Sequence, residues 1–106
     1  MKIAISINEN GIIDEFGKSS SLHIFEINED FQIIDRTEED LTNIKGCKSK
    51  IAPHLAELDV HFLITTSLGH GAKYIMDAYG LIIKTNYTGN AENCLNEFIK
   101  DIKTSK

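Results

Sequence analysis

Hydrophobic and polar positions alternate through most of the first third of the chain. Met1–Ile7 places three isoleucines on one face and small residues on the other, which predicts a strand of period two. The turn residues Asn8–Gly11 follow, and Ile12–Ser21 forms a polar, glycine-containing connection. Ser21–Ile27 and Phe31–Thr37 predict two further strands joined by a short polar turn. The first half is therefore expected to be an antiparallel meander.

The second half alternates between segments of helical period and short apolar runs. The apolar runs are typical of strands buried on both sides, and Gly80 is expected to end the middle helix as a C-terminal cap. Pro favours the first helical turn, which places the first of the three helices. The expected elements are a helix at Pro53–Leu58, a buried strand at Val60–Thr65, a helix at Gly71–Tyr79, a buried strand at Leu81–Lys84 and a helix at Asn90–Lys103.

The resulting order, βββαβαβα, predicts an α/β fold with a mixed five-stranded sheet. Strands that alternate with helices form right-handed crossovers and a parallel sheet. With the first strand central beside the fourth, the strand order is 3-2-1-4-5 with strand 2 antiparallel, a ribonuclease-H-like arrangement of one domain over residues 1–106. Ligands in such sheets bind beyond the carboxyl ends of the parallel strands. That rule selects the connections Asn8–Ser21, Thr66–His70 and Thr85–Ala91.

The composition fits an ordinary globular chain and argues against two classes of partner. It is 42% hydrophobic and 25% charged, and runs such as Phe62–Ile64 are far too short to span a membrane. No charged-then-apolar leader is evident, so we expect a cytoplasmic protein without membrane contact. Sixteen acids against eleven Lys and Arg give a net charge of −5, which disfavours binding to nucleic acid.

The acids gather in the second and third predicted strands, and this leaves two interpretations open. They form either a solvated edge that repels unwanted strand pairing or an acidic docking surface. The acids concerned are Glu26, Glu29, Asp30, Asp35, Glu38, Glu39 and Asp40.

The segment Thr65–Ala72 links a buried strand to a helix and is the strongest candidate for chemistry. Its glycines are expected to let the backbone turn tightly and approach a ligand, while the helix start offers unpaired N–H groups. This predicts a pocket for an anionic group, although a purely structural turn explains the pattern equally well. It is not a Walker loop, because no Gly-Lys-Ser/Thr follows. A second segment, Asp14–Ser21, adds Gly, Lys and serines at the same edge, either as part of the pocket or as a solvated loop.

Several short motifs in order resemble the dinitrogenase iron–molybdenum cofactor biosynthesis family. They are the opening MKIAISI, Phe16-Gly17, the Leu-Gly-x-Gly-Ala turn at Leu68–Ala72 and the closing helix after Gly89. That family includes nitrogenase cofactor carrier proteins and the C-terminal domain of the cofactor-assembling radical enzyme. The resemblance implies a non-catalytic protein, related to nitrogen fixation, that binds an iron–sulfur or iron–molybdenum-type cluster as transient cargo. Its expected partner is a cofactor-assembly or acceptor protein.

The sequence departs from the family where a cluster contact is expected. The family usually has His-Phe-Gly followed by Arg in the first loop, whereas Glu15 and Lys18 stand at these positions here. Imidazole suits iron, but a carboxylate prefers harder ions, so His70 in the neighbouring loop is a candidate replacement ligand. The expected cofactor-binding residues are Glu15, Phe16, Gly17, Lys18, Leu68, Gly69, His70 and Gly71, with His70 as the metal ligand.

Other possible metal ligands fit less well. Cys47, His54 and His61 do not have a zinc spacing, and Cys47, flanked by lysines, is either a surface thiol or a reactive or metal-binding one. Cys94 falls on the apolar side of the last helix and is expected in the core, and His23 is expected to be a packed strand residue.

Enzymatic activity is not expected. The first strand has no carboxylates for a two-metal nuclease site, and no Gly-x-Ser-x-Gly nucleophile turn occurs. Two alternatives to a cluster carrier remain. One is a regulatory or protein-interaction module that has lost cluster binding, with the acidic second and third strands as its partner surface. The other is a divalent-metal site around Cys47 and the histidines. The sequence leaves the oligomeric state open.

Overall fold

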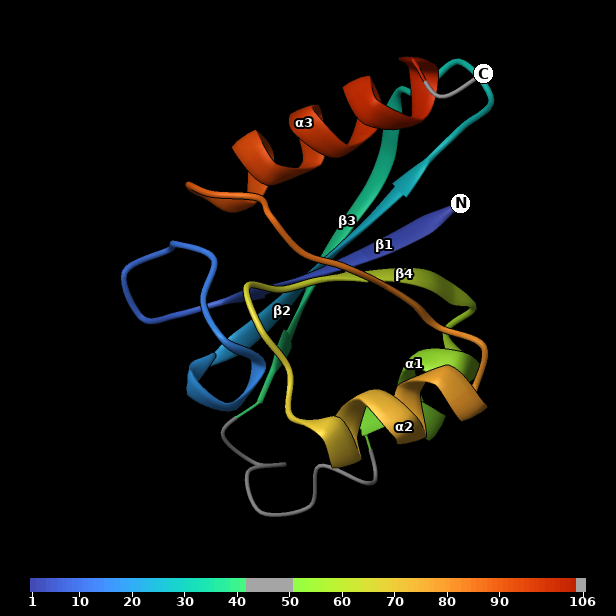
Figure 1. Cartoon of the computed structure of the whole chain (residues 1–106). Coiled ribbons are helices and arrows are strands. Elements are labelled where there is room, and N and C mark those ends of the chain that lie inside the picture. The colour runs from blue at the N-terminus through green and yellow to red at the C-terminus, as the bar shows by residue number, and fades with distance from the viewer. Residues whose placement is uncertain (42–50, 105–106) are drawn as a thin grey trace.

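The computed structural model describes residues 1–41 and 51–104. They form a five-stranded mixed sheet with helices on both faces (Figure 1). The strands are β1 (Lys2–Ile7), β2 (Ser21–Ile27), β3 (Ile33–Asp40), β4 (Val60–Ile64) and β5 (Ile82–Lys84), and the helices are α1 (Ile51–Glu57), α2 (His70–Ala78) and α3 (Ala91–Thr104), with a short 3-10 helix η1 (Phe16–Lys18).

The strand order is β3-β2-β1-β4-β5, so the predicted ribonuclease-H-like order 3-2-1-4-5 is confirmed. Central β1 pairs antiparallel with β2, where Ile3 lies opposite Phe25, and parallel with β4, where Ile5 lies opposite Ile64. The β2–β3 pair is antiparallel and the β4–β5 pair is parallel. The carboxyl ends of β1, β4 and β5 therefore meet at one edge of the sheet.

The alternation in β1 divides the core into two layers. Ile3, Ile5 and Ile7 pack under α3, together with the buried side of that helix. Ala4, between them in sequence, faces the opposite layer, which α1 and α2 cover (Figure 1). Every residue from Ile3 to Ile7 is buried, because a central strand covered on both faces has no solvent side.

Two predicted elements differ from the structure. The third strand is Ile33–Asp40 rather than the predicted Phe31–Thr37, so it starts two residues later and ends three residues later. It starts later because Phe31 has a positive φ of 62° inside a turn that the Asn28 side chain closes by accepting from the backbone of Gln32. Leu81–Lys84 was predicted to be a strand buried on both faces, but one face of the observed strand is exposed to solvent. β5 is a short edge strand, and Ile82 is 49% exposed, whereas Ile83 packs against the layer under α1 and α2.

The remaining boundaries agree closely with the pattern. Gly80 has φ +83° directly after the cap of α2, and Leu81 N–H closes the helix end on the Met76 carbonyl oxygen at 3.0 Å. Asn90 starts α3 by accepting from the Asn93 backbone at 2.8 Å. No helix in the described ranges combines the length and apolar character that crossing a membrane requires.

Candidate functional site

The connections after β1 and β4 are bonded to each other at the carboxyl edge of the sheet. The Phe16 N–H in the first connection donates to the Ser67 carbonyl oxygen in the second at 3.1 Å. The Phe16 ring is buried in the layer under α1 and α2. One backbone bond and one apolar anchor thus hold the two segments side by side, as the topological rule predicts.

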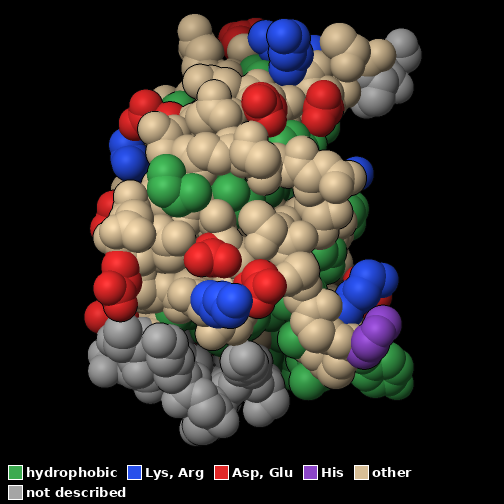
Figure 2. Space-filling model, turned by 60° about the vertical axis from the view of Figure 1, so that its left-hand side comes forward, with side chains coloured by type: hydrophobic (Ala, Val, Ile, Leu, Met, Phe, Trp, Pro, Cys, Tyr) green, Lys and Arg blue, Asp and Glu red, His purple; other side chains and the backbone are tan. Residues whose placement is uncertain are grey.

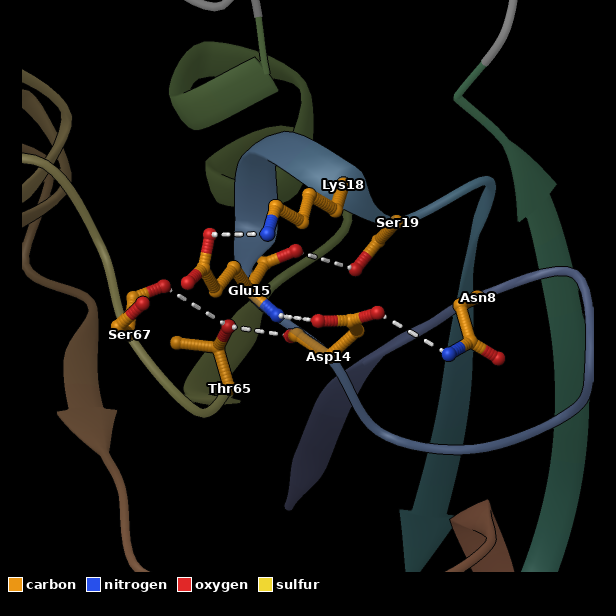
Figure 3. Close-up of polar contacts among 7 residues, drawn as sticks. All are labelled: Asn8, Asp14, Glu15, Lys18, Ser19, Thr65 and Ser67. Atoms are coloured by element: carbon orange, nitrogen blue, oxygen red, sulfur yellow. Dashed lines mark hydrogen bonds and ion pairs between the residues drawn. The ribbon is translucent and has the colours of Figure 1, made fainter.

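Two buried hydroxyl groups at the ends of β1 and β4 stabilise the contact between the two connections. Ser6, at the end of β1, donates to Thr65 Oγ1 at 2.8 Å, and Thr65 donates to the Asp14 carbonyl oxygen at 3.1 Å (Figure 3). The Asp14 N–H in turn donates to the Ser6 carbonyl oxygen at 3.3 Å. Buried hydroxyls need such partners, and here they fix the position of the first connection relative to β4.

Asp14 organises the start of that connection. Its carboxylate accepts from the Asn8 side chain at 3.0 Å and from the Glu15 N–H at 2.7 Å (Figure 3). The side-chain hydrogen bond from Asn8, followed by the backbone bond from Glu15, lowers the pKa of Asp14. The carboxylate is therefore ionised at neutral pH and is engaged with the loop itself.

A cavity of about 340 Å³ lies between the two connections. Five of the eight expected binding residues line it, together with two residues that were not expected. Its lining consists of Glu15, Phe16, Gly17, Ser67, Leu68, Gly69 and Ala72.

The other three expected residues lie close by but are not part of this lining. Lys18 places its Nζ 3.7 Å from Glu15 Oε2 at the exposed side of η1 (Figure 3). His70 and Gly71 begin α2, and both are exposed. The roles assigned to all eight residues from the sequence stay predictions.

The N-terminus of α2 has no side-chain cap. Gly69 occupies the N-cap position, and Lys73 N–H donates to its carbonyl oxygen at 2.9 Å, which begins the helical bonding. The amides of His70, Gly71 and Ala72 donate no hydrogen bond to any of the described residues. The first turn of this helix therefore offers free N–H donors beside the cavity, where an anion is stabilised.

The role of the glycines differs from the sequence prediction. Gly69 has φ −62° and ψ 152°, which any residue adopts, and Gly71 lies inside α2, so neither is needed for a tight turn. A Cβ placed at either position meets nothing within 4 Å. What Gly69 provides is the absence of a capping side chain, because Ser, Asp or Asn at this position would occupy the free amides.

The first connection contributes fewer free donors. Phe16 N–H is bonded to Ser67, and Lys18 N–H donates to the Glu15 carbonyl oxygen at 3.0 Å. Within the described residues, the Gly17 amide has no such acceptor. The donors available to a ligand therefore come mainly from α2.

Charge at this edge of the molecule is mixed. Figure 2 views the side on which the connection after β1 lies, and acidic and basic side chains are interspersed there. Glu15 and Lys18 form an exposed ion pair beside the cavity, so this lysine already has a counter-charge. Any attraction for an anion has to come from the α2 amides and from Lys18 after this pair opens.

No group of three or more His, Cys, Asp or Glu side chains gathers in the described residues in a way that could hold a metal ion. His54 instead lies 3.3 Å from Glu39, and the Lys2 N–H lies 3.5 Å from His61 Nδ1. Cys47 lies outside the described residues. Cys94 is buried, as expected, and burial raises the pKa of its thiol to about 11, which makes it a core residue rather than a ligand.

Sequence reasoning missed the residues that support the site. Ser6 and Thr65 looked like ordinary strand positions, and Asp14 was only part of a polar segment. One signal in the sequence could have found them: Ser6 and Thr65 each place a hydroxyl group at the end of a strand, and the predicted topology makes these two strands neighbours. Buried hydroxyl groups at the same sheet edge need hydrogen-bond partners, so they are expected to bond to each other.

Solved structures with the same fold confirm the architecture. A crystal structure of the protein PH0822 has a TM-score of 0.80 at 15% identity, covering 95% of this chain and 92% of that one. The structure of the apo orange protein from Desulfovibrio gigas has a TM-score of 0.72 at 16% identity, covering 98% of this chain and 88% of that one. A third match is the solution structure of a putative NifB protein from Thermotoga, described as belonging to the DUF35 family. It has a TM-score of 0.69 at 19% identity, covering 93% of this chain and 87% of that one. At these identities the likeness establishes the fold alone.

A search of curated proteins gives no match. The family profile described as "Dinitrogenase iron-molybdenum cofactor", by contrast, matches residues 1–101, nearly the whole chain. This match covers both connections at the carboxyl edge, the cavity between them and the helix whose amides open beside it. The chain therefore belongs to the dinitrogenase iron–molybdenum cofactor family.

Proposed function

We propose that this protein is a non-catalytic binding protein for an anionic iron–sulfur-type metallocluster or its precursor, which it passes to a cofactor-assembly or acceptor protein. The binding site is the cavity between the connections after β1 and β4. Family membership supports the class of cargo, and the site's own geometry supports its place.

The observation that supports the site best is the uncapped start of α2 at Gly69. Three amides of the first helical turn lack acceptors where Gly69 and Ala72 line the cavity. Sulfide and oxygen atoms at the surface of an anionic cluster accept hydrogen bonds from such N–H groups, and the positive end of the helix dipole adds to the attraction.

The donor set fits transient rather than permanent binding. The described residues provide no three-ligand metal site, so backbone amides and cavity shape would hold most of the cargo. His70, at the first position of α2, is exposed outside the cavity lining, and in this proposal it adds at most a single bond to a metal. Few protein ligands and an open cavity suit a carrier, because release then requires few bonds to break.

A second function, a protein-interaction module that has lost its cargo, is favoured by one feature. The Glu15 carboxylate is part of the cavity lining, where it repels an anion and ties up the Lys18 ammonium group. Cluster binding in vitro decides between the two functions.

The test replaces Gly69 with Asp and measures binding and stability together. An N-cap Asp accepts from the free α2 amides, which raises stability over Gly by a few tenths of a kcal/mol and Tm by about 1–3 °C in a domain of this size. The same carboxylate blocks the donors and repels the anion. We expect the wild-type protein to retain iron and sulfide after anaerobic reconstitution and gel filtration, and Gly69→Asp to lose most of both while melting at a higher temperature.

Asn90→Asp is the matched control, because it places the same carboxylate at the start of α3 and keeps the existing cap of Asn93. This variant should bind like the wild type by absorbance and metal analysis. A colourless, metal-free wild-type protein would refute cluster binding and favour the interaction module. Full binding by Gly69→Asp would mean that the cluster lies elsewhere.

A further inference from the structure

The largest of the described cavities, about 510 Å³, lies at the end of the sheet opposite the candidate site. It opens beside the β2–β3 hairpin, near the start of β1 and the C-terminal end of α3 (Figure 1). Its lining residues are Met1, Glu26, Ile27, Asn28, Glu29, Phe31 and Ile34. We call this the hairpin pocket, and it shares no residue with the cavity beside α2.

Apolar side chains of the hairpin pocket are left open to solvent. Ile34 is 57% exposed and Met1 44% exposed, and the Phe31 ring is only partly buried against the core under α3. Single exposed apolar residues are common, but these three line one hollow. An apolar side chain from another molecule would therefore find a preformed, partly desolvated place here.

Carboxylates on the rim of this pocket form no ion pair in the described part of the chain, unlike those further along β3. Glu38 lies 3.6 Å from His23 and Glu39 lies 3.3 Å from His54, one on each face of the sheet. Glu26 and Glu29 have no ion pair among the described residues.

Three positive groups lie near the hairpin pocket. The Met1 ammonium group donates to the Ile27 carbonyl oxygen at 3.1 Å, Lys2 lies opposite Glu26 in the β1–β2 register, and Lys103 Nζ lies 5.3 Å above the Phe31 ring. The contact of Lys103 also shows how an ammonium group packs on the aromatic wall of this pocket. Residues 26–35 carry four carboxylates and no Lys or Arg, so acids outnumber these three cations and a partner has to bring positive charge.

We propose that the hairpin pocket is a docking site for a partner protein segment that presents one apolar side chain flanked by Lys or Arg. The apolar side chain enters between Ile34 and Phe31, and the flanking cations pair with Glu26 and Glu29. A second copy of this chain does not fit, because it would bring the same carboxylates against this rim and its net charge is −5. This inference is independent of what the cavity beside α2 binds.

The test uses a synthetic peptide with a central Leu and two Lys on each side, titrated into the ¹⁵N-labelled protein. We expect saturable amide shifts at residues 26–34 in the hairpin. Ile34→Ser and Glu29→Lys should each weaken binding about fivefold, the effect of losing one exposed contact or reversing one rim charge. A peptide with Ser in place of Leu should bind weakly even at low salt.

Two control variants separate this pocket from general attraction between a basic peptide and an acidic protein. Tyr74→Ser removes another exposed apolar side chain, on α2, and Glu9→Lys makes the same charge change in the connection after β1. Neither should change the affinity by more than about twofold. The inference is overturned if no saturable binding occurs, if the hairpin amides do not shift, or if Glu9→Lys weakens binding as much as Glu29→Lys.

Discussion

Glu15 and Lys18 form an exposed ion pair one turn apart in the connection that borders the proposed cluster site. Glu15 is part of the cavity lining, while Lys18 is not. The Glu15 carboxylate is a like charge for an anion in the cavity, and it pairs with the Lys18 ammonium group. At the scale of single residues, we therefore expect Glu15 to weaken the proposed binding of an anion.

Glu15→Gln should tighten binding of an anionic cluster by about three- to tenfold. The change removes a like charge at the cavity and frees Lys18, and each exposed interaction of this kind contributes up to about 1 kcal/mol. Equilibrium titration followed by absorbance measures the effect. Glu9→Gln, an exposed change in the same connection, should leave the affinity unchanged. An unaltered affinity in Glu15→Gln would mean that this carboxylate does not face the cargo.

At the residue scale, the sequence predicted which loops approach each other better than it predicted how they are held together. Glycines and a lysine after β1 and β4 are visible as a pattern, and five of the eight expected residues line one cavity. The Ser6–Thr65 contact joins residues 59 positions apart, so it becomes recognisable only when the two strand ends are neighbours. The sequence pattern also does not show in which direction a side chain points. His70, for example, was expected in the pocket but is exposed and is not part of its lining.

The connection between β5 and α3 determines how α3 is placed over the sheet. Gly89 has φ +98° there, and its carbonyl oxygen accepts from the Ile13 N–H at 2.9 Å, which joins this segment to the connection after β1. A Cβ at Gly89 would lie 2.9 Å from Asn93 Nδ2, which donates to the Thr88 carbonyl oxygen at 2.7 Å. Both the backbone conformation and the available space therefore require glycine.

Gly89→Ala should lower the free energy of unfolding by about 1–3 kcal/mol, the range for a non-glycine residue held in a strained conformation. Chemical denaturation followed by circular dichroism measures it. Gly71→Ala is the control, since Gly71 is helical and a Cβ there meets nothing within 4 Å. That variant should be at least as stable as the wild type. Equal stability of Gly89→Ala and the wild type would show that the turn relaxes freely.

At the scale of elements, periodicity predicted the type and order of the α-helices and strands in the described part of the chain. It did not predict the features that local turn chemistry or an edge position determines. The start of β3 moved to Ile33 because the Asn28 side chain extends the preceding turn. The outer face of β5 is exposed because the apolar run Leu81–Ile83 does not reveal that its strand lies at the edge of the sheet. The short helix η1 carries no periodic signal of its own.

At the scale of the whole molecule, the sheet separates two surfaces with different chemistry. Backbone donors of α2 open at the carboxyl end of the parallel strands, and the hairpin pocket with its free carboxylates opens at the other end of β1. A partner that docks at the hairpin pocket leaves the cavity beside α2 accessible. The topology needed for this arrangement follows from the βββαβαβα pattern.

The most direct test of the cluster-site proposal locates an anionic molybdenum–sulfide probe on the protein. Tetrathiomolybdate is a diamagnetic dianion, so amide shifts in the ¹⁵N-labelled protein report its place directly. We predict that the largest shifts fall on Gly17 and on the Gly69–Ala72 amides, and that Gly69→Asp abolishes them. Saturable binding with the largest shifts at any other part of the chain, or no shift at the start of α2 under saturating probe, would contradict the account.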